Sequence, residues 1–286
     1  MFTKLKTLSD LVVLPHSVFA LPFALVSLLA ATGGRPPLRT VVWVVICMVL
    51  ARTAAMAYNR LVDAPLDALN PRTQNRPLPA GKMTLTQVRV LVWVSGFLFV
   101  LAAGQLNRLC LILSPWALAV VFFYSHTKHF TWASHFFLGL ALGVAPPAAW
   151  FAATGAFSIE PLWLTSAVIC FVAGFDILYA TQDVSFDKAH HLNSWVVRWG
   201  VLNSLWASRI LHILMLGFLS CFGRQLNFSL PYFAGLILLG LVLAFLHLSL
   251  AGLDGNGFRY KPFVMALNGW VAVLYLVIVG AVLWLF

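Results

Sequence analysis

The chain has 286 residues, of which 62% are hydrophobic and only 9% are charged. A soluble globular domain carries roughly 25% charged residues, so this composition excludes a soluble enzyme, a disulfide-rich secreted domain and a disordered regulator. The net charge of +10 is typical of some nucleic-acid-binding proteins, but here the basic residues are scattered through short segments between apolar runs. We therefore expect an integral membrane protein with no nucleic-acid partner.

The apolar residues form runs that are long enough to cross a bilayer, because a hydrocarbon core of ~30 Å needs about 20 helical residues. Outer-membrane barrels show short segments of alternating polarity instead, and this chain lacks them. The sequence predicts an all-α membrane protein in which residues 1–286 form one domain around a central cavity. Its nine transmembrane helices are expected near residues 15–31, 40–57, 88–106, 109–124, 134–153, 160–181, 201–221, 231–251 and 263–285.

The Lys and Arg residues between these spans divide unevenly between the two membrane sides. Twelve lie on the side of the N-terminus and four on the other side. Because cytoplasmic segments are enriched in Lys and Arg, the N-terminus is predicted to be cytoplasmic. Inside the spans, Gly139 and Gly143 form a small-xxx-small pair that predicts close helix packing. Arg52 and Arg209 are intramembrane charges, for which a functional role and snorkelling to the interface both stay open.

A first acidic cluster follows the second predicted span. Asn59, Asp63 and Asp67 follow one another at intervals of four residues, and Pro65 lies between the two aspartates. Because proline breaks an interior helical turn, we expect that these two carboxylates do not share a regular helical face. A loop or a kinked helix end would then carry them.

A second acidic cluster lies at the end of the sixth predicted span. It contains Asp176, Tyr179, Asp183 and Asp187, whose spacing of three or four residues would place them on one face of a helix. Like charges repel at this spacing, and the repulsion grows near a bilayer, where the dielectric constant is low. A cation between them is therefore predicted. Magnesium prefers oxygen ligands and binds one or two carboxylates together with substrate phosphates.

Basic residues near both clusters supply positive charge for a diphosphate, since arginine can bind phosphate through two parallel hydrogen bonds. They are Arg72, Arg76, Lys128 and Lys188. The bias of cytoplasmic segments toward Lys and Arg predicts such residues whatever the chemistry, and this alternative weighs most for Lys188. Acidic clusters, a metal and basic residues together indicate a site for an isoprenyl diphosphate whose tail lies among the helices.

The two segments resemble the N-x-x-x-D-x-x-x-D and D-x-x-Y-x-x-x-D-x-x-x-D motifs of the UbiA-type intramembrane prenyltransferases. The resemblance extends over essentially the whole chain and includes Arg72-Thr73, Arg76-Pro77-Leu78-Pro79, and Tyr124 with Lys128. It implies a Mg²⁺-dependent transferase that moves a polyprenyl group from its diphosphate to a ring carbon of a small aromatic acceptor. Such an enzyme would work among membrane lipids, in a bacterial inner membrane, in ubiquinone or menaquinone biosynthesis.

The resemblance also implies roles for individual residues. Magnesium would be held on the diphosphate by four carboxylates with help from Asn59; the four are Asp63, Asp67, Asp183 and Asp187. Asp176 and Tyr179 would orient the acceptor or stabilise the allylic cation that remains when the diphosphate departs.

The acceptor stays open between 4-hydroxybenzoate and a larger aromatic. The first span, residues 14–23, lacks the arginine that hydroxybenzoate-using relatives often carry, and with Gly174-Phe175-Asp176 it is more similar to the branch linked to the futalosine route to menaquinone. His16 in this span is a candidate acceptor-binding residue. A non-quinone acceptor is a further alternative. A cation-coupled transporter, from a different functional class, also places carboxylates on membrane helices, although usually near the midplane.

Overall fold

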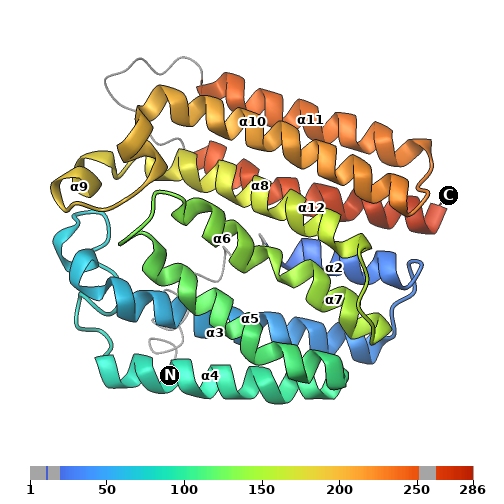
Figure 1. The fold of residues 1–286 in the computed structure, drawn as a ribbon, viewed down its shortest axis with the longest axis horizontal. Coiled ribbons are helices and arrows are strands. Elements are labelled where there is room, and N and C mark those ends of the chain that lie inside the picture. Colours follow the sequence, from blue (N-terminus) through green and yellow to red (C-terminus); the bar gives the residue numbers. More distant parts are fainter. Residues whose placement is uncertain (1–10, 12–19, 251–261, 286) are drawn as a thin grey trace.

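The computed structural model describes residue 11, residues 20–250 and residues 262–285, and within these residues all regular structure is helical (Figure 1). The helices lie side by side along the long axis of the molecule, apart from the short α9 at one end. They are α2 (Leu21–Ala31), α3 (Leu38–Leu69), α4 (Leu85–Leu106), α5 (Arg108–Thr127), α6 (Ser134–Gly143), α7 (Ala145–Thr154), α8 (Glu160–Ala180), α9 (Val184–Ala189), α10 (Trp195–Gln225), α11 (Leu230–Leu250) and α12 (Pro262–Leu285).

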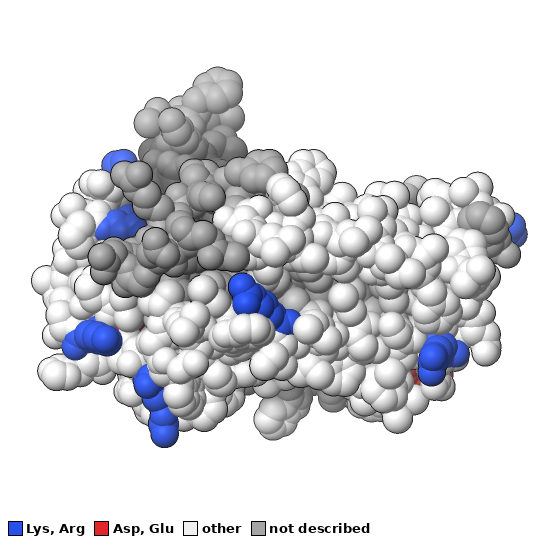
Figure 2. Space-filling view, turned by 90° about the horizontal axis from the view of Figure 1, so that it is seen from above, with Lys and Arg blue, Asp and Glu red and all other residues white. Residues whose placement is uncertain are grey.

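Within the described ranges, seven helical segments are long and apolar enough to cross a membrane, with α6 and α7 together counted as one segment. The described parts of two further apolar helices, α2 and residues 269–285 of α12, are shorter. The all-helical membrane fold expected from the sequence is therefore confirmed. Large apolar side chains are exposed along α4 and α11, among them Trp93, Phe97, Ile237 and Phe245. On the face that Figure 2 draws, Lys and Arg lie as isolated spots among uncharged residues, and Asp and Glu show only as small traces.

Helix α3 is longer than its predicted span at residues 40–57. It has 32 residues, which at 1.5 Å per residue is about 48 Å, well beyond a hydrocarbon core of ~30 Å. Its surplus length carries the first acidic cluster, for which the sequence predicted a loop or a kinked helix end. Apolarity fails to mark this extension because its polar side chains face the protein and not the lipid.

The fifth predicted span is divided in two at Val144. Helix α6 ends at Gly143, and α7 begins at Ala145 with Pro146 in its first turn. Proline has no backbone N–H to continue the α6 hydrogen-bond ladder, which accounts for the break. The carbonyl oxygen of Pro146 accepts a hydrogen bond of 2.6 Å from the Ser27 hydroxyl of α2. This hydrogen bond connects α2 with α7, and both helices line the apolar end of the cavity described below.

Glycines set the distance between α6 and α8. A Cβ atom at Gly139 would lie 2.7 Å from the carbonyl oxygen of Ile169, and one at Gly143 would lie 3.2 Å from the Ile169 side chain. These contacts confirm the close packing predicted from the small-xxx-small pair. Because α8 carries part of the second acidic cluster, this packing fixes its position relative to α6.

Helix α10 is kinked at Gly200, where φ is +80° and ψ is 172°. The predicted span, residues 201–221, began just after this kink, whereas the structure adds a first segment that starts at Trp195. Trp132, Trp195 and Trp199 pack against one another there, with ring centroids 4.1 to 5.4 Å apart. The guanidinium of Arg198 lies 5.0 Å from the centre of the Trp199 ring. This aromatic cluster holds the start of α10 beside the start of α6.

Candidate active site

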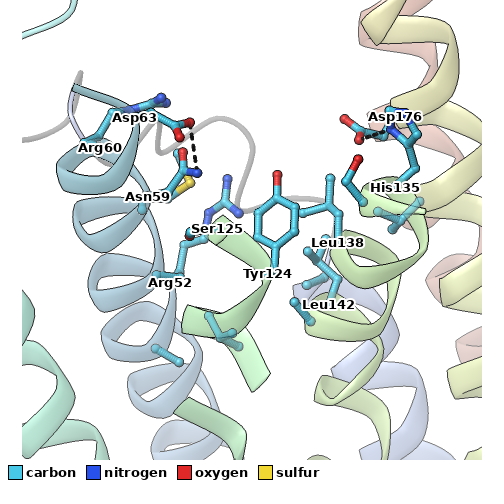
Figure 3. A pocket seen from close by; sticks show the side chains of 18 of the residues that line it. Arg52, Asn59, Arg60, Asp63, Tyr124, Ser125, His135, Leu138, Leu142 and Asp176 are labelled. Atoms are coloured by element: carbon cyan, nitrogen blue, oxygen red, sulfur yellow. Dashed lines mark hydrogen bonds and ion pairs between the residues drawn. The ribbon is translucent and has the colours of Figure 1, made fainter. Parts of the chain in front are cut away.

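A cavity of about 730 Å³ opens among the helices, with polar side chains at one end and apolar walls over the rest. It is lined by α3, α5, α6, α7 and α8, with additions from α2, α4 and the segments that follow α3 and α8. Figure 3 shows side chains of α3 and α8 on opposite sides of it, with Tyr124 between them. The cavity brings together ten of the residues predicted from the sequence: Asn59, Asp63, Asp67, Arg72, Arg76, Lys128, Asp176, Tyr179, Asp183 and Asp187.

The first acidic cluster lies on one face of α3, and the predicted disruption by Pro65 is wrong. The helix continues through Pro65 to Leu69. Pro65 is exposed on the other side of the helix, whereas Asp63 and Asp67 are each only 6% exposed. Few residues follow Pro65 before the helix ends, so little of the ladder depends on its missing N–H. The carboxylates are therefore presented by a helix.

Each carboxylate of this cluster contacts a basic side chain. Asp63 Oδ1 lies 2.7 Å from Lys128 Nζ, and Asp63 Oδ2 accepts a hydrogen bond of 3.2 Å from the Asn59 amide. Arg76 Nη1 donates to both oxygens of Asp67, at 2.6 and 2.8 Å. Arg60 Nη1 is 3.9 Å from Asp67 Oδ2. Two buried negative charges thus have compensating positive charges from three chain segments.

The second acidic cluster does not form one continuous helical face, contrary to the sequence prediction. Helix α8 ends at Ala180, and Asp183 precedes the short helix α9, which carries Asp187. The Thr181 hydroxyl donates to the Leu178 carbonyl at 2.6 Å, and the Gln182 amide donates to the Tyr179 carbonyl at 3.1 Å. Such local side-chain bonds compete with continuation of a helix. Both aspartates still line the cavity.

Arg72, in the segment that follows the first cluster, bonds to the second cluster. Its Nε donates to Asp183 Oδ1 at 2.9 Å, its Nη2 bonds to Asp183 Oδ2, and its Nη1 donates to the Tyr179 hydroxyl at 2.6 Å. The Asn70 amide also donates to Asp183 Oδ1, at 3.4 Å, while the Asn70 side-chain oxygen accepts from the backbone N–H of Arg72 at 2.9 Å. The segment after the first motif therefore binds the second motif directly.

Asp187 differs from these aspartates because its charge is poorly compensated. Burial, and next the neighbouring Asp183 carboxylate, raise the pKa of Asp187 to about 6. A carboxylate whose negative charge is disfavoured in this way gains most from a nearby cation. This is the property expected of a group that meets a cation only when a ligand is bound.

The donor set fits magnesium, provided that a ligand supplies part of the coordination. The four aspartates predicted to bind magnesium (Asp63, Asp67, Asp183 and Asp187) and Asn59 all offer oxygen atoms as ligands. In the part of the chain that the structure describes, no group of three or more His, Cys, Asp or Glu side chains is close enough to hold a metal by itself. Magnesium usually takes one or two carboxylates, several waters and substrate phosphates. Two separate pairs of aspartates match that pattern better than they match a cage made of protein ligands alone.

Asp176 lies across the cavity from Asp63 (Figure 3) and contacts a histidine that is not among the predicted site residues. Its Oδ2 is 2.6 Å from Nδ1 of His135, at the start of α6. Nε2 of His135 in turn accepts the backbone N–H of Trp195, at 3.3 Å. Figure 3 shows the Asp176 and His135 side chains together on one side of the cavity. No spacing in the sequence indicates this pair, because 41 residues separate its members.

Arg52 is a second residue with a role that the sequence left open. It lines the cavity two turns of α3 below Asn59, near Tyr124 and Ser125 in Figure 3. Its Nε is buried and has no hydrogen-bond partner among the described residues. Leaving a buried donor of a charged group unpaired is costly, so the cavity favours a ligand with an acceptor group at this depth.

Comparison with known proteins places this geometry in a family. The sequence profile of the UbiA prenyltransferase family matches residues 20–257. The chain belongs to this family. A 4-hydroxybenzoate octaprenyltransferase of Alcanivorax borkumensis is 33% identical over 218 residues, which are 76% of this chain and 74% of that protein. One of Shewanella loihica is 30% identical over 198 residues, 69% of this chain and 68% of that protein.

Solved structures of UbiA homologues share the fold. The apo structure of a UbiA homologue from Aeropyrum pernix K1 is 31% identical, with a TM-score of 0.82, and the match covers 91% of this chain and 95% of that one. A homologue from Archaeoglobus fulgidus bound to DMAPP and Mg²⁺ is 18% identical, with a TM-score of 0.76, covering 98% and 100% of the two chains. Membership of the UbiA family decides against the transporter alternative and confirms the prenyltransferase class.

Two predicted binding residues of this UbiA-family chain are not placed at the cavity. Lys188 is exposed on α9 and does not line the cavity. Its position agrees with the alternative that it reflects only the bias of cytoplasmic segments toward Lys and Arg. His16 lies outside the described residues.

Proposed function

We propose that this UbiA-family protein transfers a polyprenyl group from its diphosphate to a ring carbon of a small aromatic acid, with 4-hydroxybenzoate as the favoured acceptor, in quinone biosynthesis. The observation that carries this proposal is the cavity, which has a charged end, an apolar body and, between them, Arg52 with its buried and unpartnered Nε. The names of the bacterial relatives support 4-hydroxybenzoate.

The charged end suits the diphosphate of the donor. Arg72, Arg76 and Lys128 line it together with the four aspartates. When a diphosphate binds, these cations stabilise the charge that grows on it as the carbon–oxygen bond breaks. Magnesium, held by Asp63 and Asp67 on one side and by Asp183 and Asp187 on the other, would add Lewis-acid stabilisation of the departing diphosphate.

The apolar body suits the polyprenyl tail. Along α3 the cavity extends from Asp63 at the charged end to Val44, which is about 28 Å at 1.5 Å per residue and therefore comparable with the hydrocarbon thickness of a bilayer. Small and apolar side chains form its walls, among them Ala24, Cys47, Ala145 and Ala149. Such walls also exclude water, which would otherwise capture an allylic cation.

Arg52 suits the carboxylate of the acceptor. A guanidinium binds a carboxylate through two parallel hydrogen bonds, and Arg52 Nε has no partner among the residues described. Arg52 would hold the acceptor at a depth where Asp176 and Tyr124 line the same cavity. The hydroxybenzoate arginine that the first span lacks would thus be replaced by one on α3, which removes the main objection to 4-hydroxybenzoate.

We further propose the membrane placement. The N-terminus is cytoplasmic, nine helices span a bacterial inner membrane, and residues 1–286 work as one domain. The distribution of Lys and Arg supports this orientation, and it places the charged end of the cavity at the cytoplasmic side, where a soluble acceptor enters. A core shared by α2, α8, α10, α11 and α12 supports a single domain.

The test uses the purified full chain in lipid nanodiscs with a labelled polyprenyl diphosphate and Mg²⁺. We expect a prenylated ring product with 4-hydroxybenzoate, and none when the metal is chelated. A hydroxynaphthoate, as a larger aromatic acid, is offered in parallel. Faster transfer to the hydroxynaphthoate would favour the futalosine-linked alternative. Absence of transfer to both acids, with the donor bound normally, would contradict the proposal.

A further inference from the structure

We propose that Asp176 accepts the proton that the aromatic ring loses and that His135 is the positioning residue that orients Asp176 for this step. The inference rests on the proposed function, since it concerns the same acceptor. It assigns a task to a histidine that lies outside both acidic motifs, and it gives the carboxylate of Asp176 a task different from those of the four proposed metal ligands.

The first observation is the contact itself. His135 Nδ1 lies 2.6 Å from Asp176 Oδ2. The His135 side chain is only 5% exposed, whereas that of Asp176 is 25% exposed, and both residues line the cavity. A buried imidazole therefore holds one oxygen of a carboxylate whose remaining surface is open to the space where the acceptor would bind.

The second observation is the backbone bond that sets the tautomer of His135. Its Nε2 accepts the N–H of Trp195 at 3.3 Å, and Trp195 is the first residue of α10, where backbone N–H groups have no partner within the helix. An imidazole nitrogen that accepts a hydrogen bond carries no proton, so the hydrogen-bond network assigns the proton of neutral His135 to Nδ1. His135 Nδ1 then donates its hydrogen bond to Asp176 Oδ2.

The third observation is the contrast with the other carboxylates. Asp63, Asp67 and Asp183 each lie within ion-pair distance of a Lys or Arg side chain. The oxygens of these three carboxylates are thus already engaged by a cationic side chain. Asp176 instead contacts the His135 imidazole. It also lies on α8 one turn before Tyr179, whose hydroxyl contacts Arg72, and Figure 3 shows it across the cavity from Asp63.

The chemistry balances without any further reactant. The carbon–oxygen bond of the donor breaks, and the diphosphate leaves with the electron pair. A π electron pair of the acceptor ring forms the new carbon–carbon bond. The carbon–hydrogen bond at the same ring carbon then breaks, its electrons restore aromaticity, and the proton moves to Asp176. Oδ2 can keep its hydrogen bond from His135 Nδ1 throughout, so the carboxyl group stays oriented before and after it gains the proton.

The test measures transfer to acceptor deuterated on the ring. Ring substitution ordinarily shows almost no deuterium isotope effect, because loss of the proton follows the slow step. Asp176→Asn removes the base, so we expect kcat to fall about 10²- to 10³-fold and the isotope effect to rise clearly above unity. His135→Leu should lower kcat about 10- to 100-fold and raise the isotope effect in the same direction, with KM for the donor unchanged.

Matched variants separate positioning from folding. His135→Asn places an amide N–H near the position of Nδ1, so it should recover much of the activity lost in His135→Leu. His126 on α5 bonds to the Tyr58 hydroxyl at 2.9 Å and does not line the cavity, so His126→Leu should keep the wild-type rate and isotope effect. Donor binding to each preparation verifies that its fold is intact. If His135→Leu fails this check, the isotope effect of Asp176→Asn decides.

An isotope effect that stays at the wild-type value in Asp176→Asn, or in a folded His135→Leu, overturns the inference, whatever the loss of rate. So does full activity of His135→Leu. Both results require a wild-type enzyme that prenylates the aromatic acid. If the wild type instead makes no prenylated aromatic product, the proposed function fails and the inference fails with it. The two failures are therefore distinguishable.

Discussion

Arg72→Ala provides a sharp test of the charged end of the cavity. The Arg72 side chain contacts both oxygens of Asp183 and the Tyr179 hydroxyl, and its substitution removes a cation from the proposed diphosphate site. A hydrogen bond to a charged group contributes about 1.5 to 3 kcal/mol. The side chain is 34% exposed, so solvent screening favours the lower half of that range. About 1.5 to 2 kcal/mol corresponds to a 10- to 30-fold weaker affinity.

The assay is the initial rate of transfer at saturating acceptor with the concentration of polyprenyl diphosphate varied. We expect KM for the donor to rise about 10- to 30-fold and KM for the acceptor to change little. Arg72→Lys keeps the charge but not the planar fork and should fall between the two. Arg89 is an exposed residue at the start of α4, on the same predicted membrane side, so Arg89→Ala is the control for charge alone. Equal donor KM values in Arg72→Ala and wild type would refute the reasoning and return Arg72 to a topological role.

Three further predictions concern the carboxylates, the acceptor and the helix packing. Asp63→Ala or Asp183→Ala should abolish transfer while the protein stays folded in membranes, and full activity of either variant would remove that residue from the metal site. Arg52→Met should raise KM for the aromatic acid about 10-fold or more and leave donor KM unchanged; a selective effect on the donor would contradict the acceptor assignment. Gly139→Ala places a Cβ against the α8 backbone and should cost about 1 to 3 kcal/mol, seen as faster thermal inactivation, whereas Gly217→Ala meets nothing within 4 Å and should not.

The membrane fold could be predicted because lipid imposes a simple rule on the sequence. Helix-length apolar segments are needed wherever the chain crosses the bilayer, and the described helices lie where such segments were found. The ends of α3 and α10 could not be predicted in the same way. Asp63 and Asp67 are polar, so apolarity stops before them, although the helix that carries them runs on to Leu69.

Residues of the candidate site could be predicted only where they repeat at helical spacing, as the aspartates do, or where they lie close in sequence to the two acidic motifs. The Asp176–His135 pair depends instead on the packing of α6 against α8, and its third member is a backbone N–H at the start of α10. At Pro65, by contrast, the sequence predicted a disruption that the structure does not contain. The intrinsic tendency of proline to break helices was outweighed because Pro65 lies close to the helix end, on the exposed side of α3.

The cross-links between carboxylates and basic side chains have a consequence for how ligands are selected. A free anion that entered the cavity would have to take Arg72 and Arg76 away from the aspartates that already hold them. A free divalent cation would face the same competition for Asp63, Asp67 and Asp183. A metal diphosphate carries both signs of charge and can replace every broken pair with a new one. Discrimination would thus come from an exchange of ionic partners, which disfavours either component alone.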